Sequence, residues 1–117
     1  MKYKVVALTV LVMMSQLALA GPGRSGYVSL ENKKIQLIQG GMSRLYIYDV
    51  DMRLGGDTTC TIKTTPVLLF SSGDIVKEMY SAILMAKASG KKVDFIAGGC
   101  VEISGNTYSS ISALYVE

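Results

Sequence analysis

The sequence predicts an α+β protein, a small and mostly antiparallel β-barrel with one central α-helix at about residues 74–89. Three observations support this class. Short segments with an apolar residue at every second position, the period of a strand, fill most of the chain. One segment changes to an apolar period of 3.6 residues, the period of a helix. Strands precede and follow that helix, an order typical of a small barrel plugged by a helix.

The N-terminal segment at residues 1–20 has the features of a cleavable signal peptide. Lys2 and Lys4 precede an apolar run over residues 5–14, and residues 18–20 have the small-residue pattern that signal peptidase recognises. The run is shorter than the roughly 20 residues that span a bilayer, which disfavours an uncleaved anchor. We therefore expect export to the periplasm or the medium, cleavage before Gly21 and no stable membrane insertion.

Removal of this segment changes the charge of the chain. The full sequence has 12 basic and 9 acidic residues, a net charge of +3. Loss of Lys2 and Lys4 leaves 10 basic residues against 9 acidic ones, a net charge of +1. A nearly neutral domain lacks the basic surface that nucleic-acid binding needs. The remaining chain is expected to be a flexible N-terminus at residues 21–26 and a single domain at 27–117.

Two cysteines, Cys60 and Cys100, remain after cleavage. In an exported protein an even pair is most simply a disulfide, which here would close a loop of about 40 residues and contribute roughly 2–4 kcal/mol. Free thiols in a reducing compartment, or a pair of metal ligands, are the alternatives.

The strands before the helix are indicated by alternation and by turn residues. The clearest strand has Leu45 and Ile47 on one face and Arg44, Tyr46 and Tyr48 on the other. Turns are expected at 31–33 and at the Gly-Gly-Asp of 55–57, and Pro66 is expected to end a strand. The predicted strands are 27–30, 34–38, 43–52, 58–65 and 67–71.

The helix and the elements after it have clear boundaries in the sequence. Ser72 or Gly73 can cap the helix start, and Gly90 suits a left-handed helix end. Gly98-Gly99 is then expected to be a bulge or bend and Gly105-Asn106 a tight turn, and they separate the remaining strands. The apolar stripe of the helix is Ile75, Val76, Met79, Ala82, Ile83 and Ala86, and the later strands are predicted at 92–97, 100–104 and 108–116.

Leu84 and Met85 lie outside this apolar stripe, with Met85 near the middle of the polar face. Single exposed apolar residues are normal on protein surfaces. The alternative is that this face, with Lys77, contacts a neighbouring subunit. We keep Lys77, Leu84 and Met85 as candidates for oligomer contacts.

The composition argues against catalysis. The chain has no His, so it has neither an ordinary Ser-His or Cys-His pair nor the usual zinc ligands. We expect no cofactor and no metal. Asp49 and Asp51 are two residues apart on a predicted strand and share a face; they are paired carboxylates or a cation site, or simply a solvated surface beside Arg44 and Arg53.

Arg44, Tyr46, Tyr48 and Asp49 are the candidate ligand-binding residues. Tyrosine combines an apolar ring with a hydroxyl, which suits stacking on sugars or docking on protein. The alternative is that these tyrosines simply pack on a half-buried strand.

The segments MSRLYIYDVD (42–51), TCTIKTT (59–65) and PVLLFSSGDIVKEMYSAILMAKASGKKVDFI (66–96) together resemble the binding subunits of the subtilase-cytotoxin and typhoid-toxin type of bacterial toxins with a pentameric B component. The resemblance implies an oligonucleotide/oligosaccharide-binding (OB) type barrel, a ring with its helices toward a central pore, and recognition of host glycans. In that family the second cysteine falls on the strand just after the first. Here that strand holds Val67 to Phe70, and the second cysteine is Cys100.

These observations favour an exported, non-catalytic binding module that recognises a glycan or a protein and forms a homo-oligomer, with a pentamer as the candidate. A monomeric periplasmic structural or inhibitory protein that binds one envelope protein is the second hypothesis. An enzyme is the third, and it would need Asp49 or Asp51 beside a nucleophile.

Overall fold

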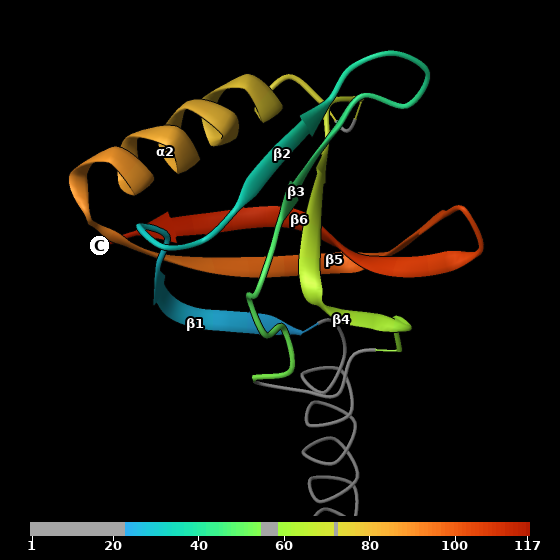
Figure 1. The fold of residues 1–117 in the computed structure, drawn as a ribbon, viewed down its shortest axis with the longest axis horizontal. Coiled ribbons are helices and arrows are strands. Elements are labelled where there is room, and N and C mark those ends of the chain that lie inside the picture. Colours follow the sequence, from blue (N-terminus) through green and yellow to red (C-terminus); the bar gives the residue numbers. More distant parts are fainter. Residues whose placement is uncertain (1–22, 55–58, 72) are drawn as a thin grey trace, which may run out of the picture.

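The structure is a computed structural model that describes residues 23–54, 59–71 and 73–117. It confirms the α+β class: the described residues form one sheet of six strands and one helix (Figure 1). The segment expected to be a signal peptide and the turn expected at 55–57 lie outside the described residues. The elements are β1 (Arg24–Ser29), β2 (Ile35–Ile38), β3 (Arg44–Ile47), β4 (Ile62–Leu69), α2 (Val76–Ser89), β5 (Lys92–Ile103) and β6 (Asn106–Val116).

The strands follow the order β1-β5-β6-β4-β3-β2. Four neighbouring pairs are antiparallel, whereas β4 and β6 run parallel, so the sheet is mixed. A closed barrel is not confirmed, because β1 and β2 remain as the two edges of the described sheet. These two edge strands are consecutive in the chain, and residues 30–34 connect them.

The hydrophobic core lies between α2 and the inner face of the sheet. The helix contributes Val76, Met79, Ile83 and Ala86, four of the six residues expected in its apolar stripe. Ile75 is instead 59% exposed. The sheet contributes alternate residues of each strand, as the two-residue period requires. Its fully buried members include Leu45, Ile47, Leu68, Val93, Phe95 and Ile111.

The helix begins two residues later than expected. Ile75 is its N-cap residue and makes no side-chain capping bond; the Val76 amide donates to the Gly73 carbonyl at 3.4 Å. Ser72, the other expected cap, lies outside the described residues. The helix end is as expected, because Gly90 has φ 76° and ends the helix in the left-handed conformation that favours glycine.

The expectation that Pro66 separates two strands is wrong, since β4 continues through it. The pairing of β4 with β6 shifts register between Ile62 and Val67. Proline has no amide hydrogen to donate, and it is tolerated where the ladder is interrupted in this way. Similarly, Gly98 and Gly99 do not divide β5; they lie at a register shift opposite β6, where a bulge keeps one long strand.

Two further boundaries differ from the sequence prediction. β1 begins at Arg24, so part of the N-terminus expected to be flexible is a strand. β3 ends at Ile47, because Asp49 has φ 60° and breaks the extended conformation. The chain then continues beside β4, where the amides of Val50 and Met52 donate to β4 carbonyls at 3.0 and 2.9 Å.

A bulge in β6 reverses the expected alternation near the C-terminus. Ala97 pairs with Ile111 and Ile96 with Ala113, so Ser112 is the extra residue. Beyond it, Leu114 packs against the core, whereas Tyr115 is 58% exposed on the outer face. With unbroken alternation along β6, Tyr115 would share the face of Ile111.

The Lys87 side chain fastens α2 to the connection between the two edge strands. Its Nζ donates to the carbonyls of Leu30, Glu31 and Lys33 at 3.0, 3.2 and 2.7 Å. An ammonium group has three donors, so this arrangement uses all of them.

We predict that Lys87→Met lowers the free energy of unfolding by about 2–3 kcal/mol, because three carbonyls lose a charged donor. Urea denaturation measures the change. Lys91→Met is the matched control, since Lys91 is exposed just beyond the same helix. Equal stability of the two variants would contradict the role assigned to Lys87.

The predicted disulfide is confirmed: Cys60 and Cys100 are bonded, with Cα atoms 5.5 Å apart and a sequence separation of 40. Cys60 is buried and Cys100 is exposed on β5. The bond fixes the segment before β4 to the far end of β5.

Reduction of this bond is expected to cost about 2–4 kcal/mol of stability, because it frees the unfolded chain from the 40-residue loop. Urea denaturation with and without dithiothreitol measures the loss. The Cys60→Ser/Cys100→Ser variant should match the reduced protein and show no response to the reductant. A wild-type protein that ignores the reductant would contradict this expectation.

Candidate functional site

The predicted ligand-binding residues lie on the outer face of the sheet, away from α2. Leu45 and Ile47 face the core, so the alternating residues Arg44, Tyr46 and Tyr48 face outward. The register of the neighbouring strands adds three side chains to this group. We call the set the β3 patch: Lys34, Gln36, Arg44, Tyr46, Tyr48 and Tyr108.

Arg44 is fixed by neutral acceptors. Its Nε donates to the Tyr46 hydroxyl at 2.8 Å, and its Nη1 donates to the Met42 carbonyl at 2.6 Å. The guanidinium carbon also lies 5.5 Å from the centre of the Tyr46 ring, within cation–π range. Its charge is therefore positioned by these contacts and not neutralised by them.

Tyr48 is fixed from the neighbouring strand. Its hydroxyl donates to Gln36 Oε1 at 2.6 Å, and the Lys34 ammonium lies 5.2 Å from its ring centre. The three tyrosine rings form a row, with ring centres 6.1 Å apart for Tyr46 and Tyr48 and 5.5 Å apart for Tyr46 and Tyr108.

Exposure separates the members of the β3 patch by role. Tyr46 is only 7% exposed, so it supports the others from below. Arg44 and Tyr48 are half-buried, and Lys34 is exposed. The surface available to a ligand is thus formed by Arg44, Tyr48 and Lys34 together with the exposed Gln36 and the half-buried Tyr108.

The structure does not join Asp49 to this group. Asp49 is exposed and follows the end of β3 in the left-handed conformation. Asp51 turns to its own neighbour: both carboxylate oxygens accept from Arg53, each at 2.9 Å. These hydrogen bonds hold the pKa of Asp51 at about 2, below its ordinary value of 3.8. The arrangement favours the solvated-surface interpretation of the two carboxylates.

The low pKa of Asp51 predicts a pH dependence. The ion pair stabilises the fold above about pH 4, the ordinary range of the carboxyl, and the stabilisation disappears as the pH falls to about 2. Both side chains are more than half exposed. Near neutral pH, the free energy of unfolding of the wild type should therefore exceed that of Asp51→Asn by less than about 1 kcal/mol. Urea denaturation at several pH values measures the difference, and a difference that does not change with pH would contradict it.

Sequence reasoning missed Lys34, Gln36 and Tyr108 as members of the β3 patch. Arg44, Tyr46 and Tyr48 share one strand and are found by alternation alone. Gln36 comes from β2, Tyr108 from β6 and Lys34 from the connection just before β2, and only the fold brings them near. The alternating segment at 34–38 is the one signal that pointed to two of them.

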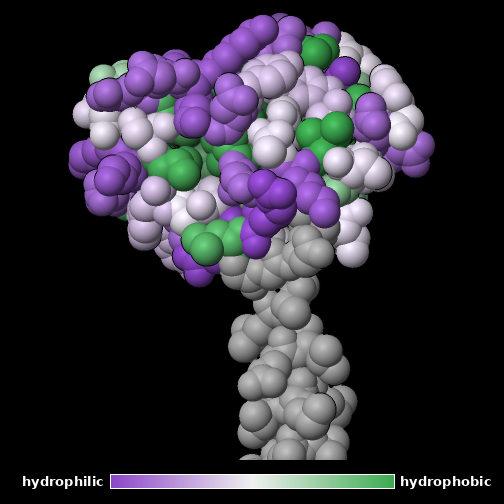
Figure 2. All heavy atoms as spheres, turned by 60° about the horizontal axis from the view of Figure 1, so that its bottom comes forward, coloured by the Kyte–Doolittle hydropathy of each residue, from purple (hydrophilic) through white to green (hydrophobic). Residues whose placement is uncertain are grey.

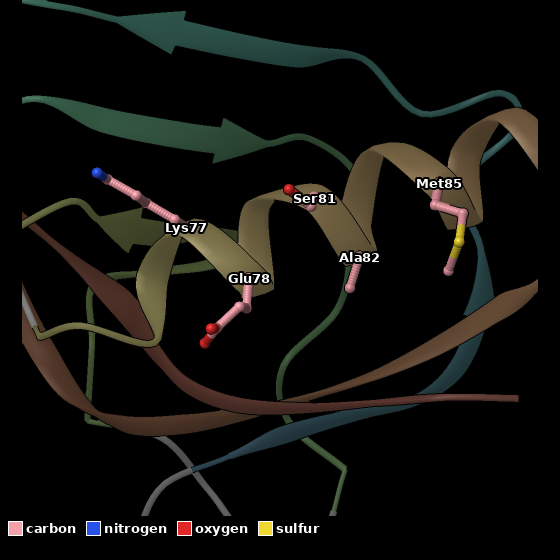
Figure 3. Close-up of a pocket in the computed structure, with 5 residues that line it drawn as sticks. All are labelled: Lys77, Glu78, Ser81, Ala82 and Met85. Carbon is pink, nitrogen blue, oxygen red and sulfur yellow. The ribbon is translucent and has the colours of Figure 1, made fainter.

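The candidate oligomer contacts lie on α2 and divide between two sides of it. Lys77 and Met85 line a hollow of about 390 Å³ with Glu78, Ser81 and Ala82. Figure 3 shows Glu78, Ala82 and Met85 pointing to one side, and Lys77 pointing to another. Met85 is 56% exposed and Leu84 is 41% exposed.

The described residues contain neither a metal-ligand set nor a membrane-spanning helix. No three side chains of the His, Cys, Asp and Glu types gather as a metal-ligand set in that part of the chain. No helix within it has the length and apolar character to cross a membrane. Comparisons with known proteins give no match to a family model, to a curated protein or to a solved structure.

Proposed function

We propose that the protein is an exported, non-catalytic binding module that recognises a glycan or an acidic protein segment through the β3 patch. The observation that carries this proposal is the pair of cations, Arg44 and Lys34, held beside outward-facing tyrosine rings. Arg44 donates to a hydroxyl and a carbonyl, and Lys34 lies over a ring. Such a surface offers charge and donors to a ligand rich in acceptor oxygens, together with a ring for its apolar face.

The same proposal includes an OB-type barrel. Such a barrel is a five-stranded, partly open Greek key that binds ligands on the face of its second and third strands. β1 and β2 lie on opposite edges of the sheet but are consecutive in the chain, so they can be counted as the two halves of one bent strand. On that count the second and third strands are β3 and β4, and β3 carries the patch.

Assembly into a ring of the toxin B-subunit type is part of the proposal. Its support is the resemblance of residues 42–96 to those subunits and the apolar side chains that α2 leaves on the surface. Met85 and the adjoining hollow would then be covered by a neighbouring copy. Disulfide formation between Cys60 and Cys100 is compatible with the expected export.

An array of neutral and acidic glycans, read with the protein expressed from the full sequence, tests the β3 patch. We expect binding that Tyr48→Ala weakens about tenfold, as loss of one aromatic contact implies. Arg44→Gln should weaken acidic glycans more than neutral ones. Ile75→Ala is the matched control, because it removes an exposed apolar side chain at the start of α2, away from the outer face of the sheet.

Native mass spectrometry of the same protein tests the assembly. A ring-forming subunit gives a single oligomer, which Met85→Glu should dissociate. A monomer that binds no glycan would remove the proposal and leave a monomeric protein with one envelope partner as the alternative.

A further inference from the structure

A second polar and aromatic cluster lies on the outer face where β1, β5 and β6 adjoin. Asp94 on β5 pairs with Tyr27 on one neighbouring strand and with Tyr115 on the other. Residues directly opposite in antiparallel strands share a face, so the two tyrosines flank the carboxylate. Val93 and Phe95 face the core, which puts Asp94 on the outer face. We call this cluster, completed by Arg24, the β1 patch.

The centre of the β1 patch is a buried carboxylate with an unused acceptor. Asp94 has no exposed surface, although it lies on the outer face of the sheet. Its Oδ2 accepts a hydrogen bond from Arg24 Nη2. Its Oδ1 is buried and accepts no hydrogen bond from the described residues. Buried polar atoms are nearly always paired, so this oxygen calls for a donor that the described chain does not supply.

Arg24 covers this carboxylate and remains accessible. Its side chain is 46% exposed. The hydrogen bond that Arg24 donates to Asp94 and the negative charge of Asp94 raise the pKa of Arg24, and the nearby Tyr115 and Tyr27 act in the same direction. One Arg24 N–H bonds to Asp94, and a guanidinium has five donors. The pair is neutral as a whole but still offers donors at the surface.

The two tyrosines form the sides of the patch. Tyr27 is 53% exposed and Tyr115 is 58% exposed. Two strand spacings separate their backbones by about 9.5 Å. Within the described residues, neither ring joins the aromatic contacts, which involve Tyr46, Tyr48, Tyr108, Phe70 and Tyr80 instead. Figure 2 shows the side of the molecule that carries β1, where hydrophilic side chains surround small, separate apolar areas.

We propose that the β1 patch is a second ligand site, which takes a neutral pyranose sugar. A half-exposed arginine can change rotamer, which lets a sugar hydroxyl donate to Asp94 Oδ1. The remaining Arg24 donors serve the hydroxyl oxygens, and the C–H face of the sugar ring stacks on a tyrosine. A neutral ligand fits because Asp94 already balances the charge of Arg24. An acidic sugar would approach a carboxylate, and a basic ligand would meet the guanidinium.

This site is independent of the β3 patch, which differs in chemistry as well as position. The β3 patch presents two cations, Arg44 and Lys34, that contact a hydroxyl, a carbonyl and a ring. The β1 patch presents an ion pair with no net charge. Each can therefore fail its test without the other.

Titration of the isotope-labelled protein with methyl β-D-glucopyranoside, followed by amide NMR, tests the site. Methyl galactoside and mannoside are further neutral probes, and methyl β-D-glucuronide is the acidic match of the glucoside. We expect at least one neutral glycoside to shift the amides of β1 and of the adjoining parts of β5 and β6. Tyr27→Ala and Tyr115→Ala should each weaken that binding about tenfold.

Tyr48→Ala is the matched control. It alters the β3 patch, so it should leave the shifts of the β1, β5 and β6 amides unchanged even where it weakens binding to the β3 patch. Tyr27→Phe should retain most of the affinity, since the ring remains. Three results would overturn the proposal. If no neutral glycoside shifts these amides, Arg24–Asp94 is a structural ion pair only. Binding of the glucuronide alone contradicts a neutral ligand, and loss of binding in Tyr48→Ala assigns the sugar to the β3 patch. Both alanine variants alter exposed side chains, so both should fold. Amide signals that stay unchanged away from the substituted residue show that they do.

Discussion

The fold depends on how its helix is joined to the connection between the two edge strands. β1 and β2 lie at opposite ends of the strand order, yet five residues connect them, so this connection must pass from one edge of the sheet to the other. The Lys34 carbonyl of this connection accepts from the Tyr48 amide. The carbonyls of Leu30, Glu31 and Lys33 accept from the Lys87 ammonium, which ties the connection to α2. α2 itself packs on the core, so through this connection it holds both edge strands in place. The two outer-face patches lie beside those edges, and their positions therefore depend on α2 as well.

The helix and the disulfide could be predicted from the sequence because each rests on a local or countable signal. An apolar period of 3.6 residues needs only one segment, and two cysteines in a chain expected to be exported leave one pairing. The strand boundaries were less predictable, because pairing partners decide them. Pro66 is a breaker only where its missing amide hydrogen is needed, and the register shift beside it removes that need. Likewise, the bulge at Ser112 exchanges the faces of Leu114 and Tyr115, which no alternation within β6 reveals.

The same distinction explains how much of each candidate site the sequence contains. Arg44, Tyr46 and Tyr48 were found together because alternate residues of one strand share a face. Gln36 and Tyr108 join them through neighbouring strands, and Arg24 meets Asp94 across 70 residues of sequence. Local sequence patterns do not predict contacts between residues so far apart in the chain. Asp49 shows the converse error: its spacing placed it on a strand face, but a positive φ ends the strand before it.

The outer face thus has two ends that differ in how their arginines are held. Arg44 is positioned by a hydroxyl, a carbonyl and a ring, contacts that orient the guanidinium without offsetting its charge. Arg24 is positioned by a buried carboxylate, which orients it and cancels its charge. Both guanidinium groups thus lie near tyrosine rings, but the net charge differs between the two ends. In the two proposals, that difference in net charge sets which ligands each end attracts. On those proposals, one sheet would distinguish acidic from neutral ligands at its two ends by the partner of each arginine.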